Sequence, residues 1–104
     1  MGFLLLYVTA GDYKEAQLIV DTLLEKKLIA CGNIVENMKA LYWWENAIQR
    51  DDEVIIIAKT SRKKFKSVES CVKEIHSYDC PCIIGLPIVE GSQEYLEWID
   101  ASVS

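Results

Sequence analysis

The sequence predicts a small α+β domain in which helices cover one face of an antiparallel sheet. The chain has 104 residues, a length typical of a single domain, so we expect one domain over residues 1–104. Apolar runs typical of strands alternate with two segments whose apolar residues recur at helical spacing. No helix separates the second and third extended segments, which are therefore expected to form a hairpin. The predicted order is strand, helix, strand, strand, helix, strand and a short final helix.

The first predicted strand covers residues 3–9, which are almost wholly apolar. Asp12 then supplies a helix N-cap, and Glu15 completes a capping-box pattern three residues later. Apolar residues at helical spacing predict a helix over residues 12–28. Its apolar face would consist of Ala16, Ile19, Val20, Leu23, Leu24 and Leu28.

The rest of the chain supplies the hairpin, a second helix and a last strand. Residues 31–44 are extended and aromatic, a turn is expected at Glu45 and Asn46, and residues 48–60 return as a strand. A second amphipathic helix is predicted over residues 61–76. A short strand at 82–86 is closed by Pro87, and Ser92 would cap the final helix. This order is that of the ferredoxin-like split βαβ fold, whose right-handed crossovers place both main helices on one face.

The strands are apolar on both faces, which a half-solvated sheet does not explain. On the first strand one face would carry Leu4, Leu6 and Val8, and the other Phe3, Leu5 and Tyr7. Only one short helix remains to cover the second face. We therefore expect a partner subunit to cover it, with the aromatic residues Tyr42, Trp43 and Trp44 of the hairpin as interface anchors.

Charge and composition narrow the classes of partner. The net charge is −5 and the pI about 4.8, which disfavours nucleic acids and anionic membranes. No apolar segment has the length of a membrane span, and no export signal is recognisable, so a cytoplasmic protein with reduced cysteines is expected. No nucleophile–base pair stands out, although His76 with Tyr78 or Asp79 could act as acid and base. The expectation is therefore a protein that is not an enzyme.

Five short motifs resemble, in order and spacing, those of the CutA divalent-cation tolerance family. They are Leu28-Ile29-Ala30-Cys31-Gly32-Asn33, Tyr42-Trp43-Trp44-Glu45-Asn46, Glu53 to Lys59-Thr60, His76-Ser77-Tyr78-Asp79-Cys80-Pro81-Cys82-Ile83 and Gly91-Ser92-Gln93-Glu94-Tyr95-Leu96-Glu97-Trp98-Ile99. The resemblance implies a homotrimer with sheets turned inward, a lateral cleft between subunits, and an association with copper binding or metal tolerance. It implies no reaction.

The metal ligands that the resemblance implies are only partly present. Copper binding in bacterial members is tied to a cysteine in the first strand and to adjacent histidines, but Val8 and Ile75 stand at two of these positions. What the chain offers instead is His76 with Cys80 and Cys82, a donor set that suits Cu(I) or Zn(II). The alternative is a helix-end histidine and two small buried residues.

A second hypothesis is a trimeric regulator, similar to the PII proteins, that binds a small anion in the cleft between subunits. The cleft that the resemblance implies would be lined by Lys59, Thr60, Tyr78 and His76. Five of the eleven cations lie in residues 59–66, at the start of the second helix, where they would attract an anion. The acidic residues Asp51, Asp52 and Glu53 of the preceding strand could instead be the acceptor of this cluster, and a solvated basic face is the remaining explanation.

Overall fold

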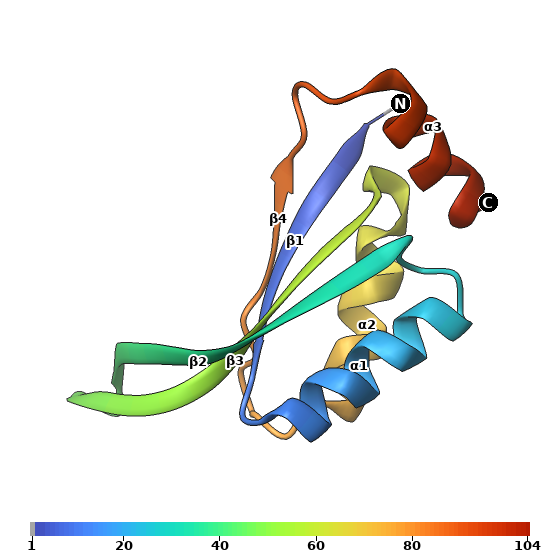
Figure 1. Cartoon of the computed structure of the whole chain (residues 1–104). Helices are drawn as coiled ribbons and strands as arrows, with labels where there is room; N and C mark the ends of the chain where they lie inside the picture. The colour runs from blue at the N-terminus through green and yellow to red at the C-terminus, as the bar shows by residue number, and fades with distance from the viewer. Residues whose placement is uncertain (1) are drawn as a thin grey trace.

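The computed structural model describes residues 2–104, which form a four-stranded antiparallel sheet and three α-helices (Figure 1). The predicted order of elements is confirmed. The elements are β1 (Phe3–Ala10), α1 (Tyr13–Glu25), β2 (Cys31–Trp44), β3 (Ala47–Ser61), a 3₁₀ turn (Arg62–Lys64), α2 (Phe65–Ile75), β4 (Ile83–Pro87) and α3 (Gln93–Ser102).

The strands lie in the order β2-β3-β1-β4, with α1 and α2 together on one face (Figure 1). In β1 every second side chain points at these helices, so Leu6 and Val8 are almost fully buried. The partners of β1 in β3 place Ala58 opposite Leu6 and Ile56 opposite Val8. The helices add the buried side chains Ala16, Ile19, Val20, Leu23, Val68, Cys71 and Val72 to this core.

Helix α1 is shorter than predicted because the chain turns left-handed at Lys27, which has φ 56°. The N–H of Leu28 donates to the Leu23 carbonyl at 2.9 Å, and that of Lys27 to the Leu24 carbonyl at 3.0 Å. These two bonds close the helix in a Schellman arrangement. At the other end the predicted N-cap is confirmed, since Asp12 Oδ1 accepts from the Glu15 N–H at 2.8 Å.

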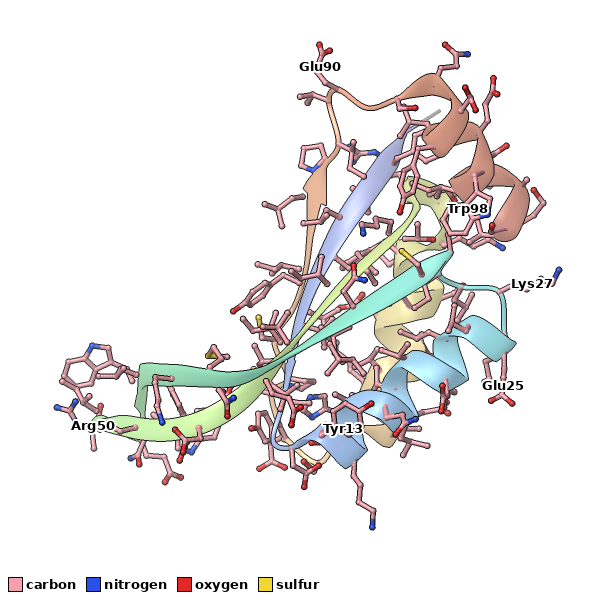
Figure 2. All side chains as sticks on the ribbon, in the orientation of Figure 1. Tyr13, Glu25, Lys27, Arg50, Glu90 and Trp98 are labelled. Carbon is pink, nitrogen blue, oxygen red and sulfur yellow. The ribbon has the colours of Figure 1, made fainter. Side chains whose placement is uncertain are left out.

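The β2–β3 hairpin turns at Glu45 and Asn46, as predicted, and both residues have positive φ. This left-handed pair matches the twist of the two strands. A bulge interrupts the β2–β3 register between Val35 and Met38. The hairpin projects beyond the helices and elongates the molecule to 44 × 26 × 22 Å (Figure 1). Figure 2 places Arg50 at its far end.

Two boundaries in the second half differ slightly from the prediction. Residues 62–64 form a 3₁₀ turn, so α2 begins at Phe65. Pro87 belongs to β4, where it is tolerated because β4 pairs only with β1 and is an edge strand. The predicted cap of α3 is confirmed, with Ser92 Oγ accepting from the Tyr95 N–H at 3.4 Å.

Neither α1 nor α2 covers the second face of the sheet, and this face is apolar, as the strand pattern predicted. Leu5, Tyr7, Ile55 and Ile57 are only half-buried there. Their neighbours are more exposed: Val35 keeps 44%, Ile84 51% and Leu86 46% of their surface. We call this surface the open face. Helix α3 reaches one end of it through Tyr95, whose hydroxyl lies 3.6 Å from Cys31 Sγ.

None of the helices within residues 2–104 combines the length and the apolar character that crossing a bilayer requires.

Candidate functional site

A pocket of about 630 Å³ lies where the projecting hairpin meets the open face. It is built from three parts of the chain: β1, the β2–β3 hairpin and the segment that follows α2. The lining residues are Tyr7, Thr9, Met38, Lys39, Ala40, Leu41, Tyr42, Trp44, Asp51, Glu53, Tyr78, Asp79, Cys80 and Cys82. Its size is that of an ordinary small-molecule site.

Two tyrosine–carboxylate pairs form the polar part of this pocket. The Tyr78 hydroxyl donates to Glu53 Oε2 at 3.2 Å, and the Tyr42 hydroxyl donates to Asp51 Oδ2. Burial, the charge of Glu53 and this hydrogen bond raise the pKa of Tyr78. The hydrogen bond to Asp51 raises the pKa of Tyr42 to about 12. Both phenols therefore stay protonated at neutral pH and act as donors to the carboxylates.

The charge of the pocket is negative. Asp51, Glu53 and Asp79 line it, against the single cation Lys39. Lys39 Nζ is itself held by Asp52 Oδ1 at 2.6 Å. These carboxylates would repel an anion from the part of the subunit that surrounds Tyr78. The anion site expected at Lys59, in a cleft between subunits, stays a prediction.

Within a single subunit the predicted cleft residues do not come together. Lys59 lies opposite Leu5 on the open face, where its Nζ donates to Asn33 Oδ1 at 2.9 Å and lies 6.0 Å from the centre of the Tyr95 ring. Thr60 points to the helix face, is fully buried and donates to the Leu28 carbonyl at 2.7 Å. Successive strand residues face opposite ways, so Lys59 and Thr60 cannot line one cleft within a subunit.

His76 is enclosed by its own chain. Its side chain has no exposed surface. Nδ1 accepts from the Tyr78 N–H at 3.0 Å, which assigns the ring proton to Nε2, and Nε2 donates to the Thr9 carbonyl at 2.7 Å. Both ring nitrogens therefore already form hydrogen bonds within the protein. His76 anchors the start of the 76–82 segment to β1, the helix-end role that was the alternative to a metal ligand.

Glu15 is a second anchor of this segment, one that the sequence indicated only as a capping residue. Its Oε1 accepts from the Gly11 N–H at 3.1 Å, and its Oε2 accepts from the Ser77 N–H at 2.7 Å. Burial alone would raise the pKa of Glu15, but the hydrogen bonds from Gly11 and Ser77 outweigh burial, and the pKa lies below its usual value of 4.5. The side chain thus joins the start of α1 to the end of α2.

The two cysteines of the predicted metal site line the pocket without His76. Cys80 is exposed and Cys82 is partly buried. Burial, followed by the charges of Glu53 and Cys80, raises the pKa of the Cys82 thiol. Within residues 2–104 no three histidine, cysteine or carboxylate side chains are grouped as a metal site requires. The structure therefore does not assemble the predicted set of His76, Cys80 and Cys82.

The three hairpin aromatics predicted as interface anchors are exposed in the single subunit. Trp43 keeps 71% of its surface, Trp44 44% and Tyr42 38%. Tyr42 and Trp44 face the pocket, whereas Trp43 is not among the residues that line it. A contact between subunits remains a prediction for all three.

The fold and the pocket together define a ferredoxin-like subunit with an uncovered apolar sheet. The sequence model of the family described as CutA1 divalent ion tolerance protein matches residues 4–102. The chain belongs to this family, which confirms the resemblance seen in the motifs.

Individual relatives match over nearly the whole chain. The divalent-cation tolerance protein CutA of Archaeoglobus fulgidus is 46% identical over 94% of this chain and 95% of its own. The protein of the same description from Pyrococcus horikoshii is 38% identical over 92% of this chain and 93% of its own. A solved structure, described as the periplasmic divalent cation tolerance protein CutA from Archaeoglobus fulgidus, is 44% identical, covers 98% of this chain and 99% of its own, and has a TM-score of 0.95.

Proposed function

We propose that this protein acts in copper tolerance as a homotrimer whose subunits bind the metal through cysteine sulfur. We propose a trimer because the open face is apolar and because Val35, Ile84 and Leu86 remain exposed on it in the single subunit. The name that the relatives share, divalent-cation tolerance protein, supports the association with metal. A cytoplasmic location is part of this proposal, although one solved relative is described as periplasmic.

A closed ring of subunits accounts for several exposed features at once. Strands β2 and β4 are the two edges of the sheet, and open edges invite uncontrolled pairing with other chains. Cyclic assembly would pair or cover both edges and bury the open face in the same step. The projecting hairpin gives each subunit an arm, carrying Trp43, with which to contact its neighbour.

Sulfur is the donor best placed for a copper ion in this chain. Cys80 and Cys82 lie on one pocket wall, and two thiolates satisfy Cu(I), which favours soft ligands and low coordination numbers. The imidazole of His76 would first have to give up its bonds to Thr9 and Tyr78. Because the pKa of Cys82 is raised, metal binding must displace a proton and should weaken as the pH falls.

The test is the copper stoichiometry of the reduced protein, measured with Cu(I) under anaerobic conditions. The double variant Cys80→Ser, Cys82→Ser should lose at least about tenfold in Cu(I) affinity, because hydroxyls are poor ligands for this ion. The matched control is Cys31→Ser, which removes a partly exposed thiol near Tyr95, outside the pocket. Unchanged Cu(I) binding by the double variant would contradict a sulfur site.

The alternative function, binding of a small anion at Lys59, has weaker support. Lys59 is exposed enough to meet a ligand, but its ammonium group is already bound to Asn33, and Thr60 and Tyr78 lie elsewhere. If this alternative holds, phosphate should raise the Tm of the parent and leave the Tm of Lys59→Ala unchanged. Equal stabilisation of both proteins excludes Lys59 as the anion site.

A further inference from the structure

The pocket between hairpin and open face contains a buried carboxylate without a counter-charge. Glu53 is 7% exposed, and within residues 2–104 no lysine, arginine or histidine forms an ion pair with it. Its only hydrogen bond among the described side chains is the one that Oε2 accepts from Tyr78. A buried negative charge is unfavourable unless an opposite charge or hydrogen-bond donors compensate it. The second oxygen of Glu53 is thus available to a ligand in the pocket.

The walls around this carboxylate are aromatic. Tyr7 comes from β1, Tyr78 from the segment that follows α2, and Tyr42 and Trp44 from the hairpin. Asp51, two residues before Glu53 on the same strand, adds a second carboxylate on the same side. The negative faces of aromatic rings attract organic cations, and their apolar area favours the hydrocarbon part of such a ligand.

We propose that this pocket binds a small organic ammonium ion, with its charged nitrogen at Glu53 and Asp51 and its hydrocarbon part against the aromatic walls. A hard metal ion such as Mg²⁺ or Ca²⁺ fits Glu53 and Asp51 less well, because it requires several oxygen ligands and the described part of the chain offers no group of three histidine, cysteine or carboxylate side chains. A volume of about 630 Å³ leaves room for the hydrocarbon part as well as the charged group.

The proposed trimer places a neighbouring subunit beside this pocket, because Tyr7 and Thr9 belong to the open face. The inference rests on the proposed function only in this respect: the pocket has to stay open in the assembled protein. It does not depend on copper or on the two cysteines. The experiment therefore uses the assembled wild-type chain, and its oligomeric state is measured by sedimentation in the same buffer.

The probes are three compounds with one ring and nearly one shape: benzylamine, which is a cation at pH 7, neutral benzyl alcohol, and the anion benzoate. Binding is followed by titration calorimetry or by changes in the NMR signals of the protein. Benzylamine should bind at least about tenfold more tightly than benzyl alcohol, and benzoate should not bind. Equal affinities for benzylamine and benzyl alcohol overturn the proposal, as does absence of benzylamine binding to the trimer.

Variants of Glu53, Asp51 and Asp52 show which carboxylate binds the ammonium group of benzylamine. Glu53→Gln keeps the shape of the side chain and should weaken benzylamine binding about tenfold, without affecting benzyl alcohol. Asp52→Asn removes the neighbouring carboxylate, which is absent from the pocket lining and pairs with Lys39, and should leave binding within about twofold. The exposed Asp51→Asn gives a second test that does not disturb a buried residue, with about threefold weaker binding expected. Unchanged benzylamine binding in both Glu53→Gln and Asp51→Asn overturns the assignment of the site.

If the sample sediments as a monomer, the proposed trimer fails whatever the benzylamine result. If the trimer is present and benzylamine does not bind, only the ammonium site fails, and a side chain of the neighbouring subunit becomes the occupant to examine.

Discussion

At the scale of single residues, the pocket is held in place by side chains that do not line it. Glu15 accepts N–H groups from Gly11 and Ser77, and His76 links Thr9 to Tyr78. Together they fix the start of the segment that carries Tyr78 and Cys80 into the pocket. Neither anchor contacts a ligand in our account, so both are positioning residues.

The lowered pKa of Glu15 predicts how stability responds to acid. Because the folded pKa lies below 4.5, the ionised side chain contributes stability above about pH 4.5, and that contribution is lost as the pH falls through the folded pKa. Glu15→Gln should therefore be less stable at pH 7, by about 1–2 kcal/mol, and lose less stability between pH 5 and pH 3. Urea unfolding at several pH values measures both effects.

The control for this experiment is Glu25→Gln, an exposed position at the end of α1. It should keep the parental slope of stability against pH. A Glu15→Gln protein with the parental slope would show that Glu15 is not the titrating group.

Gly32 gives a second prediction at the scale of a residue. A Cβ at this position would lie 2.9 Å from Val20 Cγ1, inside the interface between α1 and β2. Val20 is almost fully buried and cannot move aside freely, so Gly32→Ala should cost about 1–3 kcal/mol of unfolding free energy. Gly11→Ala is the matched comparison, because its Cβ would meet only ordinary contacts at 3.5 Å and longer. Equal stability of the two variants would refute the close approach.

At the scale of elements, the hairpin turn retains strain that substitution can relieve. Glu45 has φ 50°, a left-handed conformation that a long side chain adopts less readily than asparagine or glycine. Glu45→Gly should therefore stabilise the protein by about 0.5–1 kcal/mol. Gln49→Gly, made within β3, should destabilise it instead. Denaturant unfolding with unchanged m-values tests both, and a loss of stability in Glu45→Gly would contradict the left-handed turn.

The elements were predictable because each has a local cause in the sequence. Asp12 and Ser92 signal helix starts, and the apolar runs indicate buried strands. The end of α1 was not predictable in the same way, because its left-handed residue is Lys27 rather than the usual glycine. Strand periodicity already indicates that Lys59 and Thr60 face opposite sides of the sheet, as they do within the subunit. The cleft between subunits that they were expected to line stays a prediction.

The pocket could not be predicted from local sequence patterns, because it combines residues that are far apart along the chain. Glu53 and Tyr78 are 25 positions apart, and they meet only because the end of α2 is anchored to β1 beside β3. The sequence showed Asp51, Asp52 and Glu53 as three adjacent acids. Successive side chains of β3 point to opposite faces, and this alternation directs Asp51 and Glu53 into the pocket. Asp52 points to the other face and pairs with Lys39.

At the scale of the whole molecule, we expect Trp43 to stabilise the assembly and not the single subunit. With 71% of its surface exposed, it contributes little to the fold of one chain. Trp43→Ala should therefore weaken association by about 2 kcal/mol or more per interface and lower the Tm in a concentration-dependent manner. Tyr13→Ala, at an exposed aromatic of α1, should change neither association nor its concentration dependence. If the Trp43→Ala protein associates as strongly as the parent, Trp43 is not part of the interface.

We propose that the open face of the sheet is a surface between subunits. The most direct measurement is sedimentation equilibrium of the wild-type protein at low micromolar concentration. We expect a single species with three times the subunit mass of 11.8 kDa. A species of 11.8 kDa with Leu5, Ile55 and Ile57 accessible to solvent would contradict it.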